Sequence, residues 1–332
     1  ANSTTASENT AIGYAALSEL TTGIQNTAVG TEALQSVTTT VNNTAVGYKA
    51  LEANTGTSNT ALGCKALDEN TTGNQNTAVG DHALDNNTTA SSNTAVGYIA
   101  LEMNTTGGSN VAVGAEALEA NTTGARNTAV GFEALHLSTA DDNVAIGNYA
   151  LEQNTTGNKA VAVGSYALDN NTTGSDNIGI GYHALGVNTT GGNNTAIGYK
   201  ALEDNNASDN TAVGKNALTA NTTGTNNTAV GKDAGQAVTT ANQTTLVGKG
   251  SGLNVTTGEG NTLLGYNCGQ NITTGSANTA IGRDTLRTAT GSSNNTAVGY
   301  HALYETGGNG YNTACGWYAG FEVTTGENNL LL

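Results

Sequence analysis

Proline is absent from this chain of 332 residues, and charged residues make up only 11% of it. Disordered chains usually carry proline and dense charge, and they lack regularly placed β-branched residues. Here a Val, Ile, Leu or Cys recurs at one phase of a repeat, so the composition argues against disorder. Aromatic residues are also scarce, at 5%, and Gly, Ala, Asn and Thr fill much of the rest, which differs from an ordinary globular domain.

Basic residues are few, with 10 Lys and Arg against 26 Asp and Glu, which gives a net charge of −16. Such a surface repels phosphate and offers no basic stripe, so we expect no nucleic-acid partner. No run of about 18 apolar residues occurs, so we expect no insertion into a membrane. The acidic charge fits a soluble rod that does not stick to itself sideways.

Only three cysteines are present. Cys268 and Cys315 stand where other repeats have Ala and Val, which predicts small buried apolar side chains. Cys64 stands at a variable position. Coils of a solenoid are stacked at about 4.8 Å, too far apart over several coils for a disulfide within the chain. The cysteines neither require nor exclude an oxidising compartment.

What the chain has in abundance is a repeat. A glycine follows a short apolar pair nineteen times, from Ala11-Ile12-Gly13 to Ala314-Cys315-Gly316, at spacings of 17 or 16 residues. A unit this short cannot bury an apolar face alone and must stack on copies of itself. We therefore predict an all-β, rod-shaped parallel β-solenoid or β-roll of about 19 coils. We expect one continuous array over residues 1–332, with Leu-type repeats in 1–231 and mixed Gly/Val-type and Leu-type repeats in 232–332.

Each repeat is counted from the Asn that opens Asn59-Thr60-Ala61-Leu62-Gly63, which is position 1. Thr at position 2 and Val at position 4 share one strand face, because strand side chains alternate. With the Leu at position 9, this face predicts a structural core. The core residues named on this basis are Val29, Val46, Val79, Val96, Val130, Val213, Leu51, Leu84 and Leu118.

Ala at position 3 and Gly at position 5 leave the opposite face bare. Gly in a strand is costly unless another backbone comes very close or the Gly opens a bend that needs positive φ, and both explanations point to a thin coil. We expect that close neighbour to be an identical chain, which predicts a homo-oligomer. The close-packing glycines are Gly30, Gly47, Gly80, Gly97 and Gly131.

Asn at position 1 should form a file along the stack, because equal residues lie directly above one another. Buried amides need hydrogen-bond partners, so these Asn residues are interpreted as structural ladders rather than ligand groups. The predicted ladder comprises Asn26, Asn43, Asn76, Asn93 and Asn127.

The repeat ends in Asn-Thr-Thr-Gly, as in Asn70-Thr71-Thr72-Gly73, and the 16-residue units lose their residue here. Asn and Gly tolerate left-handed backbone conformations, so we expect this segment to turn. Asn-Thr-Thr is also an N-glycosylation acceptor, and the turn interpretation is preferred over it.

Positions 9 and 12 vary together. Where Leu at position 9 becomes Gly, as at Gly235, position 12 becomes aliphatic, as at Val238. The simplest cause is that both side chains reach one core space, so that volume lost at one position is restored at the other.

No constellation of catalytic residues can be assembled. The four His residues lie in separate coils, so they cannot converge on one metal ion and are interpreted as solvated corners. Asp and Glu show no paired pattern that recurs between neighbouring units, and no phosphate loop is present. We therefore expect no enzyme activity, no catalytic, cofactor-binding or metal-binding residue and no cofactor.

Units such as Asn143-Val144-Ala145-Ile146-Gly147 resemble the head repeats of trimeric autotransporter adhesins, whose fold is a parallel β-roll trimer. The longer Asn-Thr-Ala-Val-Gly-Tyr unit is similar to repeats of bacterial and phage tail-fibre-domain proteins. The resemblance implies trimerisation and adhesion, although the unit here is longer than that of the adhesins.

These features predict a non-enzymatic structural protein, the rigid shaft or filament of an extracellular, cell-surface or virion fibre. Its expected partner is itself, as a trimer or a head-to-tail polymer, in which Leu330, Leu331 and Leu332 would make the end-to-end contact. An adhesin or tail-fibre segment that binds a cell-surface receptor or glycan is the alternative. An ice-binding protein with Thr files on a flat face is a lesser one.

Overall fold

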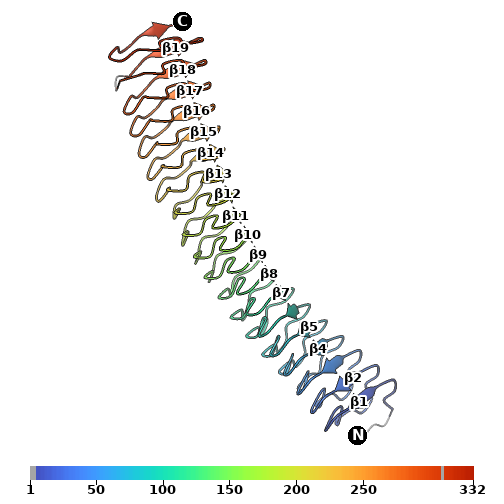
Figure 1. Ribbon diagram of the computed structural model, residues 1–332. Coiled ribbons are helices and arrows are strands. Elements are labelled where there is room, and N and C mark those ends of the chain that lie inside the picture. The colour runs from blue at the N-terminus through green and yellow to red at the C-terminus, as the bar shows by residue number, and fades with distance from the viewer. Residues whose placement is uncertain (1–4, 308–309) are drawn as a thin grey trace. The chain divides into compact units, whose positions relative to one another are not determined.

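The computed structural model describes residues 5–307 and 310–332. These residues form twenty short strands and no helix, and one strand falls in each repeat (Figure 1). The predicted β-solenoid of about 19 coils is thus confirmed. In the part of the chain described, no helix is available that could cross a membrane.

The chain divides into two compact units, Ala1–Ser165 and Tyr166–Leu332, which are described separately. Their boundary does not coincide with the change of repeat type near residue 232 that the sequence analysis noted. We number each coil by its strand, so that coil 5 contains β5.

Unit 1 contains the strands β1 (Thr10–Ile12), β2 (Thr27–Val29), β3 (Thr44–Val46), β4 (Thr60–Leu62), β5 (Thr77–Val79), β6 (Thr94–Val96), β7 (Val111–Val113), β8 (Thr128–Val130), β9 (Val144–Ile146) and β10 (Val161–Val163). Each strand pairs in parallel with the next one along the chain. The same repeat positions lie opposite one another, as Ala78 lies opposite Ala95.

Unit 2 contains the strands β11 (Ile178–Ile180), β12 (Thr195–Ile197), β13 (Thr211–Val213), β14 (Thr228–Val230), β15 (Thr245–Val247), β16 (Thr262–Leu264), β17 (Thr279–Ile281), β18 (Thr296–Val298), β19 (Thr313–Cys315) and β20 (Leu330–Leu331). Each of these strands also pairs in parallel with the next one along the chain. A 16-residue coil does not disturb the register, since Thr195 still lies opposite Thr211.

The interior of each coil is built from the small face of the strand, which corrects the predicted core. In coil 5, Ala78, Ala83 and Leu84 are fully buried, together with Asn76 and Asn87. The methyl groups of Ala78 and Ala83 thus share the interior of this coil with the Leu84 side chain. The predicted Leu residues Leu51, Leu84 and Leu118 are fully buried.

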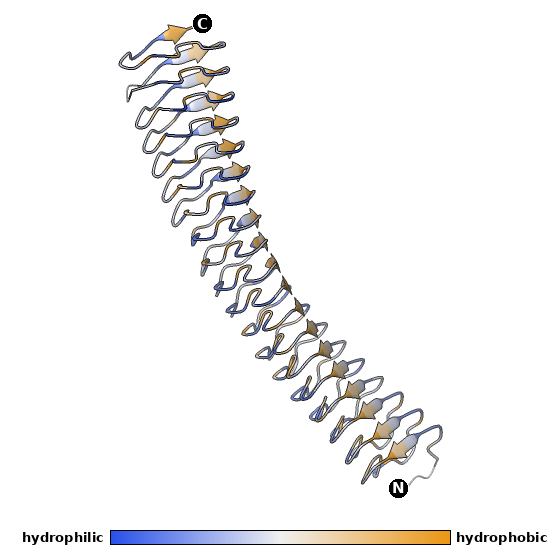
Figure 2. Cartoon of the chain, viewed as in Figure 1, coloured by the Kyte–Doolittle hydropathy of each residue, from blue (hydrophilic) through white to orange (hydrophobic). Residues whose placement is uncertain are grey.

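The predicted Val residues lie on the outer face instead. Position 4 is half-exposed or exposed in every strand from β1 to β19, and many arrows in Figure 2 end in the apolar colour. The prediction was wrong for Val29, Val46, Val79, Val96, Val130 and Val213. Cys315 is likewise exposed, whereas Cys268 is buried as expected.

Side chains at positions 9 and 12 share one core space, as the covariation predicted, and the side chain at position 3 enters the same space, which the covariation did not predict. Where position 9 is Gly235, the next coil places Leu246 at position 3, and its Cδ1 lies 2.6 Å from where a Cβ of Gly235 would be. Val238 reaches within 3.3 Å of the same point. Gly320 likewise faces Leu331 of the next coil, whereas a Cβ of Gly252 would lie 2.8 Å from Leu246 Cδ2 in its own coil and 3.3 Å from Leu263 Cδ1 in the next. Large side chains at positions 3 and 12 thus fill the space that a glycine at position 9 leaves.

The wall opposite the strand consists of turns rather than a second sheet. Residues at positions 7, 9 and 17 have positive φ, including Lys49 (φ 58) and Leu51 (φ 54). Their amides bond to neighbouring coils, as Lys49 N–H donates to the Thr31 carbonyl at 3.0 Å and Leu51 N–H to the Ala66 carbonyl at 3.0 Å. The Asn-Thr-Thr-Gly segment is not left-handed, which corrects the predicted origin of the turn.

Two files of Asn side chains run inside each unit. At position 1, the backbone N–H of Asn93 donates to Oδ1 of Asn76 at 2.9 Å, and Asn76 Nδ2 donates to the Ala90 carbonyl at 2.9 Å. At position 12, Asn104 Nδ2 donates to Oδ1 of Asn87 at 2.9 Å. The five predicted ladder residues are buried and make such contacts: Asn26, Asn43, Asn76, Asn93 and Asn127.

Candidate functional site

The outer strand face carries the same types of residue from coil to coil in both units. Position 2 carries Thr, Val or Ile in β1 to β19, and position 4 carries Val, Ile, Leu or Cys. Neither position carries a charged residue, although the whole chain has a net charge of −16. Exposed examples at position 4 include Leu62 at 48% and Ile146 at 41%. Within each unit, positions 2 and 4 thus form an uncharged stripe of Thr and aliphatic side chains, and large exposed patches with apolar side chains mark interaction sites.

The glycines at position 5 follow this stripe. A Cβ on Gly30 would overlap the backbone of Gly47, and the same holds for Gly47, Gly80, Gly97 and Gly131 against the next glycine along the stack. Their φ angles, such as +140° at Gly30, also disfavour a side chain. The close backbone is therefore the next coil of the same chain, not the second chain that the sequence analysis invoked.

Charged side chains gather at the corner formed by positions 7 and 10. Position 10 carries a carboxylate in five successive coils of unit 1: Glu52, Asp68, Asp85, Glu102 and Glu119. We call this file, with the side chains at position 7 beside it, the acidic ridge. This file corrects the expectation that Asp and Glu show no pattern that recurs between neighbouring units.

Crowding on the acidic ridge changes proton affinities. Burial, together with the neighbouring Glu52 and Asp85 carboxylates, raises the pKa of Asp68 to about 6. Burial, with Glu119 nearby, also raises the pKa of Glu102. Lys49 offsets some of this charge, because its Nζ lies 2.7 Å from Glu52 Oε2.

His82 and His136 lie on this ridge against carboxylates, not on solvated corners. His82 Nδ1 is 2.7 Å from Asp85 Oδ2, and His136 Nε2 is 3.2 Å from Glu119 Oε2. In unit 2, His183 packs against Tyr182, with ring centroids 4.4 Å apart. As predicted, no two of the four His residues meet at one point within the described residues.

An aromatic cluster occupies the same corner in coils 18 and 19. His301 stacks on Tyr300, Tyr304 and Tyr318, with ring centroids 4.0 to 4.9 Å apart. Trp317 lies beside Tyr318 and is 76% exposed. The cluster thus combines half-buried stacked rings with one strongly exposed indole.

The sequon asparagines are sequestered by the fold. Their side chains at position 12 are fully buried, and Nδ2 of Asn87, for example, donates to Asn70 Oδ1 at 2.7 Å. A glycan cannot be attached to such an atom in the folded chain. The buried residues are Asn70, Asn87, Asn104, Asn121, Asn154, Asn171, Asn188 and Asn221.

At the end of unit 2, Leu330 and Leu332 are exposed, at 70% and 90%. Leu331 is half-buried beside Gly320. The end-to-end contact named for these residues stays a prediction.

No protein-family model matches the chain, and a comparison with curated proteins gives no match either.

Proposed function

We propose that this chain is a non-enzymatic structural protein, the shaft of an extracellular fibre, and that copies of it associate through the outer strand face. The observation that carries the proposal is the uncharged Thr and Val stripe, which repeats in every coil from β1 to β19 and is half-exposed or exposed at position 4. Interface cores are depleted of charge, whereas this molecule is acidic elsewhere. Burying the stripe against equal stripes would remove apolar surface from water in every coil.

The resemblance to trimeric β-roll heads favours three copies. A trimer would place three outer faces around one axis. The rest of the surface, including the acidic ridge, would stay in solvent. Head-to-tail growth through Leu330 to Leu332 is a separate part of the proposal.

Sedimentation analysis of two variants of equal charge tests the association. Val79→Glu with Val113→Glu places two carboxylates on the outer face of coils 5 and 7, where both Val side chains are half-buried. Thr72→Glu with Thr106→Glu adds the same charge at exposed loop positions of coils 4 and 6. We expect the parent and the loop variant to be oligomers and the face variant to be a folded monomer. A parent that stays monomeric at every concentration, or a face variant that associates like the parent, contradicts the proposal.

An adhesin role is the second candidate, and the aromatic cluster of coils 18 and 19 favours it. Exposed Trp and Tyr rings supply rigid amphipathic contact area. Glycan-array binding that is lost in Trp317→Ala, and kept in Tyr48→Ala in coil 3, would support a receptor role. Tyr48 is also exposed, so its removal is a matched control.

One structural observation supports ice binding. Thr side chains lie on the outer face in files, at the strand spacing of about 4.8 Å. Thermal hysteresis of the purified chain decides this point. A strong effect that Val79→Glu with Val113→Glu abolishes would favour ice binding over self-association, because one face cannot serve both partners.

A further inference from the structure

Two groups of three side chains on the acidic ridge share both their chemistry and their places in the repeat. Their members are His82, Asp85 and Glu102 in the first group, and Glu116, Glu119 and His136 in the second. In each group, two members occupy positions 7 and 10 of one coil, and the third occupies position 10 of the next coil. Each group therefore offers one imidazole and two carboxylates from the same three repeat positions.

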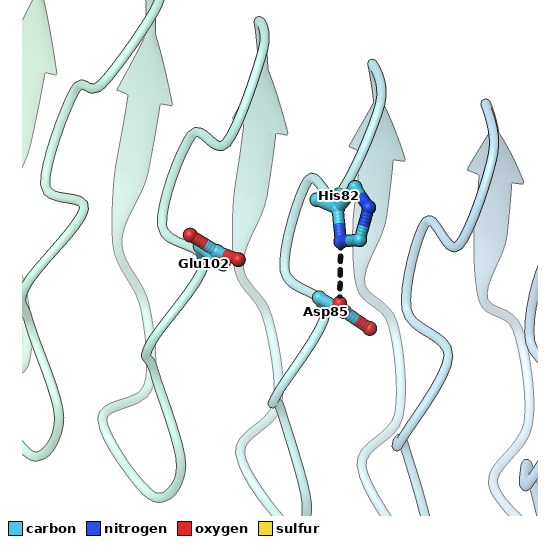
Figure 3. Close-up of side chains that lie close together, drawn as sticks. All are labelled: His82, Asp85 and Glu102. Carbon is cyan, nitrogen blue, oxygen red and sulfur yellow. Dashed lines mark hydrogen bonds and ion pairs between the residues drawn. The ribbon is translucent and has the colours of Figure 1, made fainter.

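The donor atoms of each group already lie near one another. One nitrogen or oxygen from each residue lies within 4.8 Å of the other two. Figure 3 shows the first group, with His82 and Asp85 on one coil and Glu102 on the next. A metal ion with bonds of about 2.0 to 2.2 Å draws its donors slightly closer than this, which small side-chain rotations allow.

The second nitrogen of each imidazole faces another carboxylate. His82 Nε2 lies 3.8 Å from Asp81 Oδ1, and His136 Nδ1 lies 3.7 Å from Glu133 Oε2. Metal-bound His residues almost always donate their other N–H to a carboxylate, a carbonyl or water, which fixes the ring orientation. In both groups a carboxylate thus lies close to the second nitrogen, at a distance from which a small rotation would form this orienting hydrogen bond.

We propose that each group binds one divalent transition-metal ion, such as Zn²⁺, so that unit 1 carries two metal sites. The first site joins coil 5 to coil 6, and the second joins coil 7 to coil 8. An imidazole donor favours Zn²⁺ over Ca²⁺ or Mg²⁺, which prefer oxygen ligands alone. Three protein donors leave a coordination position for water. The ion also offsets the charge of carboxylates that successive coils place side by side.

Titration of the full chain, freed of metal with a chelator, tests the proposal. We expect two equivalents of Zn²⁺ by calorimetry and two equivalents of Co²⁺ by visible absorption. His82→Gln and His136→Gln should each leave one equivalent, and the double variant should leave none. His183→Gln is the matched control, because His183 also occupies position 7 but belongs to neither group. It should keep both equivalents.

The orienting carboxylate gives an independent measurement. Asp81→Asn should weaken binding at the first site about tenfold and leave the second unchanged. Glu102→Gln should remove the first site without changing either His residue. Far-UV circular dichroism and the sedimentation coefficient should match the parent in every variant.

Three results would overturn the proposal. One is the absence of Zn²⁺ binding by the parent. Another is unchanged stoichiometry in the double His variant. The last is equally strong binding of Ca²⁺ or Mg²⁺, since this indicates diffuse attraction to the acidic ridge.

Discussion

The Cα of Gly265 faces the carbonyl oxygen of Gly282, one coil further along unit 2, with no room for a side chain between them. Gly265 also has φ of +144°, which L-residues rarely adopt. Gly265→Ala should therefore lower the free energy of unfolding, by about 1–3 kcal/mol for the backbone conformation alone. Urea denaturation followed by circular dichroism measures the effect.

Gly291→Ala is the control in the same unit. Gly291 is exposed, and a Cβ there would meet only Thr274 Oγ1 at 3.7 Å. This variant should unfold at the same urea concentration as the parent. Equal effects of the two substitutions would contradict the close approach of the coils.

The interior and exterior of coil 5 can be distinguished by two truncations. Leu84 is fully buried, so Leu84→Ala should cost about 2–5 kcal/mol. Val79 is half-buried on the outer face, so Val79→Ala should cost less than about 1 kcal/mol. The measurement is made at dilution where the chain is monomeric. A larger loss of unfolding free energy in Val79→Ala than in Leu84→Ala would contradict this assignment of the interior and support the Val core that the sequence predicted.

The shared core space predicts compensation between two positions. Leu246→Ala should cost about 2–5 kcal/mol, because Gly235 and Gly252, which face Leu246, have no side chain to fill the space it leaves. Adding Gly235→Leu should recover part of that loss. The double variant would have the side chains that coils 2 and 3 already have at these places. Coil 2 has Leu34 at position 9 and Val37 at position 12, and coil 3 has Ala45 at position 3. A double-mutant cycle checks this prediction, because it compares the free energies of unfolding of the parent, the two single variants and the double variant. Strictly additive effects would disprove it.

Asp68 predicts a pH dependence of stability. Its pKa is raised to about 6 by burial and by Glu52 and Asp85, so the folded chain favours the protonated form. Stability from this group is present below about pH 4 and is lost as the pH rises through 6. Asp68→Asn should therefore stabilise the chain at pH 7.5, by about 1 kcal/mol after solvent screening, and have no effect near pH 3.5.

Asp142 should respond with the opposite sign. Arg126, whose Nε lies 2.6 Å from Asp142 Oδ1, lowers the pKa of this carboxyl. Asp142→Asn should therefore be neutral or destabilising at pH 7.5. Urea midpoints at the two pH values measure both variants, and a stabilising effect of Asp68→Asn that persists at pH 3.5 would count against a charge origin.

The sequence predicts the coil period, the strand in each repeat, the buried Leu residues and the Asn ladders, because each depends on contacts between equal positions. It does not reveal which face of the strand points inward, since alternating Thr and Val suit a packed face and an outer face equally. The left-handed residues at positions 7 and 9 are mostly not glycine, as at Lys49 (φ 58) and Leu51 (φ 54), so the course of the turns is also hard to predict from the repeat. For the same reason, the ridge groups around His82 and His136 emerge only when neighbouring coils are placed side by side.

The in-register pairing of coils also bears on how such a chain could change in length. Within each unit, the contacts of a coil are made largely to the coils before and after it, as the pairs of Ala78 with Ala95 and of Thr195 with Thr211 illustrate. Removal or duplication of one whole repeat, by unequal recombination within its coding sequence, would join two surfaces that already fit. Even a 16-residue repeat preserves the strand register. Such a gene could drift in repeat number without a compensating substitution elsewhere.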